Sequence, residues 1–152
     1  MKCCLVLLIG MLVPPLTWAA TRHVESTGYY VRLNEPSWME LNDGREAYPD
    51  YRRHITAVDG NGKVESHWCS GTNVVSKEKF EWGGGYCAAF DEDGDTYWMW
   101  FRPDGAERFA WKVMGGTGKY EGSSGNGSST FAKELPDGTT VIRIQGELEL
   151  RD

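Results

Sequence analysis

The sequence predicts an all-β domain, a small closed antiparallel barrel of about eight strands. Short segments rich in β-branched and aromatic residues recur, turn residues separate them, and several alternate between apolar and polar residues with a period of two. No segment carries a capped helical stripe, and the best helix candidate, residues 36–41, is short. Open sheet edges invite aggregation, so such a sheet closes into a barrel or a sandwich, and the tight connections favour the barrel.

Clusters of glycine with aspartate or asparagine mark the turns, because glycine supplies positive φ and the other two tolerate it. The clusters begin at residues 42, 59, 83, 91, 103, 115, 122 and 136. We expect the strands between them at residues 27–33, 51–58, 63–69, 71–76, 85–91, 95–102, 107–114 and 139–150, with 127–134 as a possible ninth.

The alternation of apolar and polar residues is clearest in the last strand, where one face consists of Ile142, Ile144, Gly146, Leu148 and Leu150. In the same way, residues 107–114 put Phe109, Trp111 and Val113 on one face. Residues 97–101, in contrast, are apolar on both faces. One face can fill the barrel and the other needs cover, so we hypothesise a subunit interface there, in a dimer or trimer.

The first nineteen residues are typical of a signal peptide, with Lys2, an apolar run from Leu5 to Val13 and small residues ending at Ala19. An uncleaved anchor is the alternative, but the run is too short for a bilayer core of about 30 Å. No later stretch is long and apolar enough to span a membrane. We expect residues 1–19 to be a signal peptide, residues 20–152 to form one barrel domain, and the protein to be secreted or periplasmic.

The charge of the chain is −6, and loss of Lys2 with the signal makes it −7. This acidic balance argues against nucleic acid as a partner. Cys69 and Cys87 remain after cleavage, and an even count in an exported domain predicts one disulfide. Closing that loop would stabilise the fold by roughly 3 kcal/mol. A metal pair is the weaker alternative, because no histidine stands at ligand spacing.

Residues 115–119 begin like a phosphate-binding loop, but Tyr120 stands where serine or threonine is required. We therefore expect no nucleotide and no other cofactor. The three histidines, His23, His54 and His67, show no metal or triad spacing, which favours ordinary packing roles. No nucleophile elbow is present in the sequence.

Residues 91–95 begin like a calcium loop, with carboxylates at Asp91, Asp93 and Asp95. Thr96 stands at the turn position that requires glycine, and Arg102 replaces the closing glutamate. A solvated hairpin turn is the favoured interpretation, with a weak calcium site as the alternative. We expect no other metal site.

Six of the seven tryptophans follow residue 19, which is many for this length. Core and interface packing explains them most simply. The alternative is an aromatic-lined cavity for a flat or lipid-like ligand, since small barrels can hold one small molecule. If such a cavity exists, the ligand-binding candidates are Trp98, Trp100 and Trp111, because they lie in the best-defined strands.

The run Gly115-Gly116-Thr117-Gly118-Lys119-Tyr120-Glu121-Gly122, with the glycine-rich turn and strand behind it, resembles the allene oxide cyclase and dirigent barrel superfamily. Small exported bacterial relatives of that group look similar over residues 67–150, including Gly85-Tyr86-Cys87 and the acidic turn at 91–95. The resemblance implies a calycin-like eight-stranded barrel, often trimeric. Some members isomerise or cyclise hydrophobic intermediates, and others steer phenoxy-radical coupling. No residue here matches the plant cyclases' interior glutamate.

These observations favour a non-catalytic exported barrel that binds a hydrophobic small molecule or a protein partner. The alternatives are an isomerase or cyclase that confines a hydrophobic intermediate, and a structural envelope component with a filled interior. An acidic side chain in an apolar barrel, with a raised pKa, would favour the enzyme. Glu40, Glu65 and Glu81 are the candidates.

Overall fold

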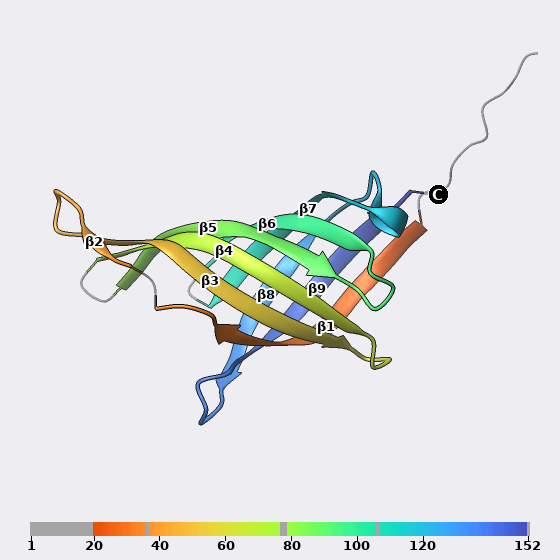
Figure 1. Ribbon diagram of the computed structural model, residues 1–152, viewed down its shortest axis with the longest axis horizontal. Coiled ribbons are helices and arrows are strands. Elements are labelled where there is room, and N and C mark those ends of the chain that lie inside the picture. Colours follow the sequence, from red (N-terminus) through yellow and green to blue (C-terminus); the bar gives the residue numbers. More distant parts are fainter. Residues whose placement is uncertain (1–19, 36, 77–78, 106, 152) are drawn as a thin grey trace, which may run out of the picture.

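The computed structural model describes residues 20–35, 37–76, 79–105 and 107–151 (Figure 1). Nearly all of them lie in strands. The strands are β1 (Ala20–Arg32), β2 (Met39–Glu40), β3 (Glu46–Asp59), β4 (Val64–Ser76), β5 (Lys79–Phe90), β6 (Thr96–Pro103), β7 (Arg108–Gly116), β8 (Ser124–Glu134) and β9 (Thr140–Leu150). A short 3₁₀ helix, η1 (Gly118–Tyr120), follows β7. In the described part of the chain no helix is long and apolar enough to cross a membrane.

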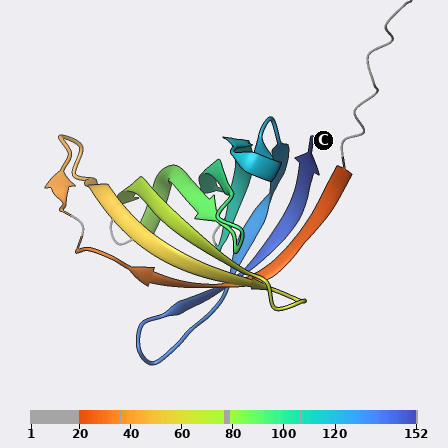
Figure 2. The same ribbon diagram turned by 45° about the vertical axis from the view of Figure 1, so that its right-hand side comes forward.

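Eight of the strands form a closed antiparallel barrel, as predicted. Each strand from β3 to β9 pairs with the next in sequence, and β1 pairs with both β9 and β3, which closes the ring (Figures 1 and 2). β2 adds two residues to the edge of β3. The turns after β3 and β5, together with η1, gather at one end of the barrel, and the β8–β9 turn lies toward the other (Figure 1).

Several strand predictions need correction, and among them β3 and β5 begin five and six residues earlier than predicted. Residues 63–69 and 71–76 form the single strand β4, because Ser70 and Gly71 continue the pairing with Tyr86 and Gly85 on β5 instead of turning. A Cβ on Gly71 would meet the backbone of Gly84 and Gly85, so glycine here allows two strands to approach closely.

At the start of the described chain, β1 begins at Ala20, seven residues before the prediction, because β9 gives partners to its residues from Ala20 to Tyr30. The possible ninth strand at 127–134 exists as part of β8. Residues 37–41 form no helix and contain β2 instead, while residue 36 lies outside the described part. The proposed signal peptide, residues 1–19, also lies outside it.

The predicted alternation of side chains is confirmed in the last strands. Ile142, Ile144 and Leu148 are buried in the barrel, and so are Trp111 and Val113 of β7. Tyr97 and Met99 of β6 point into the same core, whereas Trp98 between them is 44% exposed on the outside.

The predicted disulfide is also confirmed. Cys69 on β4 and Cys87 on β5 are paired directly across the two strands, and their sulfur atoms are joined. Both residues are buried in the barrel wall.

Candidate functional site: a cavity inside the barrel

The barrel interior contains a cavity of about 310 Å³. Apolar and aromatic side chains from the barrel strands make up most of its wall, with a small number of polar groups. The lining residues used below are Tyr30, Arg53, Glu65, His67, Tyr97, Glu107, Trp111, Ser129, Phe131, Ile142 and Ile144. The chemistry of the cavity depends on where its charged residues lie.

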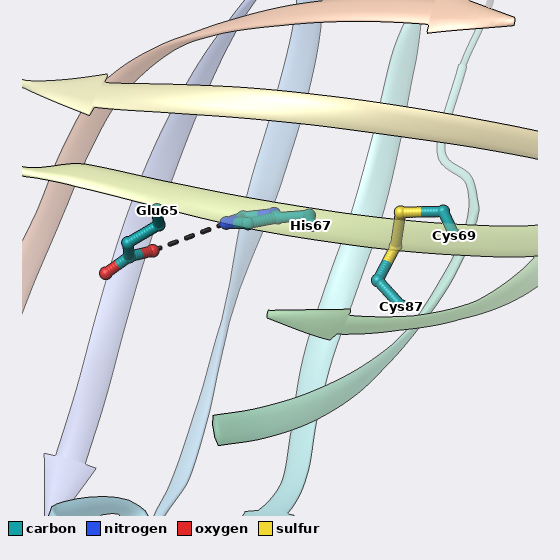
Figure 3. Close-up of a disulfide and its surroundings, with 4 residues drawn as sticks. All are labelled: Glu65, His67, Cys69 and Cys87. Carbon is teal, nitrogen blue, oxygen red and sulfur yellow. Dashed lines mark hydrogen bonds and ion pairs between the residues drawn. A yellow bond between two sulfur atoms is a disulfide. The ribbon is translucent and has the colours of Figure 1, made fainter. Parts of the chain in front are cut away.

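β4 brings the first charged group to the cavity. Because side chains alternate along a strand, Glu65, His67 and Cys69 share the inner face, and all three line the cavity (Figure 3). Trp68 between them points outward and is 54% exposed. Neighbouring strands complete the group, since Tyr97 comes from β6 and Arg22 from β1.

The carboxylate of Glu65 has three partners. The Tyr97 hydroxyl donates a hydrogen bond of 2.7 Å to Oε2, and His67 Nε2 lies 3.3 Å from the same oxygen (Figure 3). The Arg22 guanidinium lies 3.3 Å from Oε1. We call Glu65, His67, Tyr97 and Arg22 together the Glu65 end of the cavity.

These contacts determine the ionisation of the cluster. Burial raises the pKa of Glu65, but the hydrogen bonds from His67 and Tyr97 and the charge of Arg22 outweigh it, so the pKa lies below its ordinary value. Burial and the neighbouring Glu65 raise the pKa of Tyr97 well above its ordinary value. At neutral pH the cluster therefore combines an ionised carboxylate with a protonated phenol.

The ionic network continues outward from Arg22, which donates a 3.3 Å hydrogen bond to the Tyr120 hydroxyl. Burial, Glu65 and a hydrogen bond to Asp91 raise the pKa of Tyr120 to about 12. Asp91 in turn is ion-paired with Lys119 at 2.6 Å. Arg22 lines a second hollow of about 300 Å³ beside β1, and Glu65 lines both that hollow and the interior cavity, so their ion pair lies where the two spaces approach one another.

Arg53 on β3 is the other interior cation, and it has a different environment. Its Cζ atom lies 3.7 Å from the ring centroid of Tyr51 and 4.5 Å from that of Tyr30. Its Nε atom is buried and has no hydrogen-bond partner among the described residues. Burial lowers the pKa of Arg53 to about 10, so the side chain stays charged at neutral pH.

We call Tyr30, Arg53, Glu107 and Phe131 the Arg53 end of the cavity. Glu107 and Phe131 both line the cavity and are exposed, so solvent reaches the interior here. Within the described ranges, no carboxylate forms an ion pair with Arg53, and this includes the carboxylate of Glu107.

The three tryptophan candidates do not lie together. Trp111 lines the cavity, its ring lies against Gly127 and Gly146, and its Nε1 atom is buried without a hydrogen-bond partner among the described residues. Trp98 and Trp100 are on the outer face of β6, and the cavity wall does not include them. Trp100 lines a separate, open hollow on the barrel exterior.

The acidic turn after β5 is cross-linked by a side chain. The Lys119 ammonium lies 2.6 Å from Asp91 and 2.7 Å from Asp93, and the Lys119 backbone N–H donates to Asp95 at 3.3 Å. In the described part of the chain, no cluster of three or more acidic, histidine or cysteine side chains is arranged to hold a metal ion. Lys119 thus supplies the positive charge that the clustered carboxylates require.

Of the three glutamates considered from the sequence, Glu65 alone faces the cavity. Glu40 and Glu81 are exposed, and Glu81 lies 3.5 Å from Arg45. The raised pKa that would have favoured the enzyme is not found at Glu65, where the partners of the carboxylate outweigh its burial and lower its pKa. The sequence did contain a signal for the site, since Glu65 and His67 are two positions apart on a strand and so must share a face.

No family model matches the chain, and no curated protein matches it. Two similar solved structures are those of the pterocarpan synthase dirigent proteins GePTS1 and PsPTS1. GePTS1 has a TM-score of 0.58 at 13% identity, over 90% of this chain and 93% of its own. PsPTS1 has a TM-score of 0.57 at 14% identity, over 88% and 97%. At these identities the likeness establishes the fold alone, and this chain has a dirigent-like barrel.

Proposed function

We propose that the barrel binds a small, largely apolar molecule in its interior. The observation that carries the proposal is the cavity of about 310 Å³, which lies at the lower end of the roughly 300–1,000 Å³ typical of ligand pockets. A structural envelope component would favour a filled interior, so the open space supports binding over that alternative. The two structural neighbours are named pterocarpan synthase dirigent proteins, and a synthase of that name agrees with this proposal.

The wall offers the contacts that such a ligand needs. Ile142, Ile144 and the indole of Trp111 bury an apolar body, and removal of this surface from water provides the main driving force. The few polar groups, at the two ends of the cavity, then determine orientation. Glu107 and Phe131 lie where the ligand enters.

Fluorescence titration with N-phenyl-1-naphthylamine, a neutral apolar probe, tests this proposal. Ser129→Trp fills the cavity from β8, and Thr130→Trp adds the same bulk at the neighbouring exposed position. We expect saturable emission with the wild type and Thr130→Trp and its loss with Ser129→Trp, provided that circular dichroism shows both variants folded. No saturable uptake by the wild type, or equal uptake by all three proteins, would refute interior binding.

A second candidate function is proton transfer on a confined ligand. It is favoured by the 2.7 Å hydrogen bond between Glu65, ionised at neutral pH, and the Tyr97 hydroxyl, which stays protonated. A carboxylate can act as a base and a phenol as an electrophilic donor, and both groups line the cavity. This is the enzyme alternative, an isomerase or cyclase that works by confinement.

Deuterium exchange at the acidic methylene of 2-tetralone, an apolar ketone, measures such proton transfer by NMR. We expect the wild type to accelerate exchange and Glu65→Gln to abolish the acceleration, while Glu134→Gln retains it. Glu134 provides the control because its side chain is exposed and does not line the cavity. Exchange at the buffer rate with the wild type, or full activity in Glu65→Gln, would exclude Glu65 as a base.

We also propose that the protein is exported and self-associates. The disulfide supports an oxidising compartment. Exposed aromatic side chains on the outer faces of β4, β5 and β6, among them Trp68, Tyr86 and Trp98, support an interface between copies. N-terminal sequencing of the secreted protein should begin at residue 20, and sedimentation at micromolar concentration should reveal a dimer or trimer. An intact N-terminus or a strict monomer would contradict these two proposals respectively.

A further inference from the structure

Arg53 is a half-buried interior cation with a buried Nε atom, and it has no counter-ion among the described residues. Removing a charge from water is costly unless hydrogen bonds and an opposite charge replace the solvent. A guanidinium has five N–H donors, yet no side-chain hydrogen bond or ion pair joins Arg53 to any residue in the described ranges. Glu65, in the same cavity, has three partners.

Two tyrosine rings hold the guanidinium without satisfying it. The Arg53 Cζ atom lies over the rings of Tyr30 and Tyr51. These cation–π contacts attract the charge but supply no conventional hydrogen-bond acceptor to the N–H groups. Burial lowers the pKa of Arg53 in the absence of any compensating anion. The side chain is therefore positioned with its donors uncommitted.

A second unsatisfied donor lines the same cavity, since the Trp111 indole N–H is buried and has no partner among the described residues. The carboxylate of Glu65, in contrast, is already engaged by its neighbours. Two buried donors that line the cavity, on Arg53 and Trp111, therefore have no acceptor among the described residues. Glu107 also lines the cavity, but its side chain is exposed and forms no ion pair with Arg53. A ligand group with negative charge and several acceptor atoms would supply the missing counter-ion and the missing acceptors.

We propose that the ligand of this cavity is an amphipathic organic monoanion, whose compact anionic group, of the carboxylate type, binds Arg53. This inference rests on the proposed interior binding and adds the chemical class of the ligand. The apolar body of the ligand lies along the cavity toward the Glu65 end. The ionised Glu65 repels a second negative charge there, which limits the ligand to one anionic group.

Isothermal titration calorimetry with 1-naphthylacetate and 1-naphthylacetamide tests the proposal, because the two probes differ in charge and hardly in size. A hydrogen bond to a charged group predicts that the wild type binds the carboxylate at least about tenfold more tightly than the amide. Arg53→Gln should remove this preference and leave the affinity for the amide unchanged. Arg52→Gln should retain it, because Arg52 is exposed on the opposite face of the same strand.

The outcomes separate the two proposals. Equal affinity of the wild type for both probes would overturn the monoanion inference and leave apolar binding intact. Binding of neither probe, together with no uptake of the neutral naphthylamine, would overturn the proposed function itself. If Arg53→Gln still binds the carboxylate tenfold more tightly than the amide, the anionic group does not bind at Arg53. The wild-type comparison needs no variant, so it stays decisive even if Arg53→Gln does not fold.

Discussion

Each end of the cavity contains a charged side chain, and the two ends differ in the partners that this charge has. At the Glu65 end, the carboxylate has a phenol, an imidazole and a guanidinium within 3.3 Å. At the Arg53 end, the Cζ atom of the guanidinium lies over two tyrosine rings, and its side chain has no hydrogen-bonding partner among the described residues. We infer that the protein itself supplies the partners of Glu65, whereas a ligand supplies the missing partner of Arg53.

The largest effect should come from Glu65→Leu. This change leaves the Tyr97 hydroxyl buried without its acceptor and Arg22 without its counter-ion, and we expect a loss of about 2–3 kcal/mol in the free energy of unfolding. Urea unfolding at pH 7 measures it. Glu134→Leu, at an exposed position of β8, should change stability by less than about 0.5 kcal/mol. Similar small changes in both variants would show that the cluster contributes nothing to the fold.

The effect of pH on the free energy of unfolding should be smaller than that of Glu65→Leu, and its direction follows from the pKa of Glu65. Because the pKa of Glu65 is lower in the folded than in the unfolded protein, its contribution is fully present above the unfolded value of about 4.3. That contribution disappears as the pH falls through the folded pKa. Wild type should therefore lose more stability between pH 7 and pH 3 than Glu65→Gln does, as urea midpoints will measure. A steeper loss in Glu65→Gln would mean that burial, not pairing, controls Glu65.

Arg53→Met should behave unlike Glu65→Leu, with a change in free energy of unfolding between zero and about 1 kcal/mol in the stabilising direction. Methionine retains apolar contact with the tyrosine rings and removes a half-buried charge that has no counter-ion among the described residues. Urea unfolding without ligand is again the measurement. A loss above about 2 kcal/mol would assign Arg53 a structural role and would remove the contrast between the two ends.

The smallest effect concerns Lys119, at the outer limit of the network around Arg22. Its ammonium already neutralises Asp91 and Asp93. Calorimetric titration of the wild type with millimolar calcium should therefore give no binding heat, whereas Lys119→Ala should bind calcium weakly if the turn has any such capacity. Calcium binding by the wild type at micromolar concentration would show that the ion displaces Lys119.

Much of the fold could be predicted from the sequence, because alternation and turn residues are local signals. The interior face of β9 and the Cys69–Cys87 bond follow from such signals. The continuity of β4 through Gly71 could not be predicted, because a glycine that permits close strand approach resembles one that makes a turn. The first half of β1 was missed because its partner lies at the other end of the chain.

The site was harder to predict than the fold. His67 was assigned an ordinary role because no metal or triad spacing surrounds it, although Glu65 two positions earlier shares its face. Arg22, Tyr97 and Tyr120 join that cluster through barrel closure, which no local pattern encodes. The significance of Arg53 depends on partners that are absent from its surroundings, and a sequence does not show what a side chain lacks.

The most direct test of this contrast is an NMR spectrum of the arginine Nε–H groups, which observes both ends of the cavity in one sample. On saturation with 1-naphthylacetate, the Arg53 signal should shift strongly and the Arg22 signal should hardly move, whereas 1-naphthylacetamide should leave the Arg53 signal near its free position. If the Arg53 signal does not shift on saturation with 1-naphthylacetate, or if the Arg22 signal shifts more, the anion does not bind at Arg53 and the proposed contrast between the two ends is wrong.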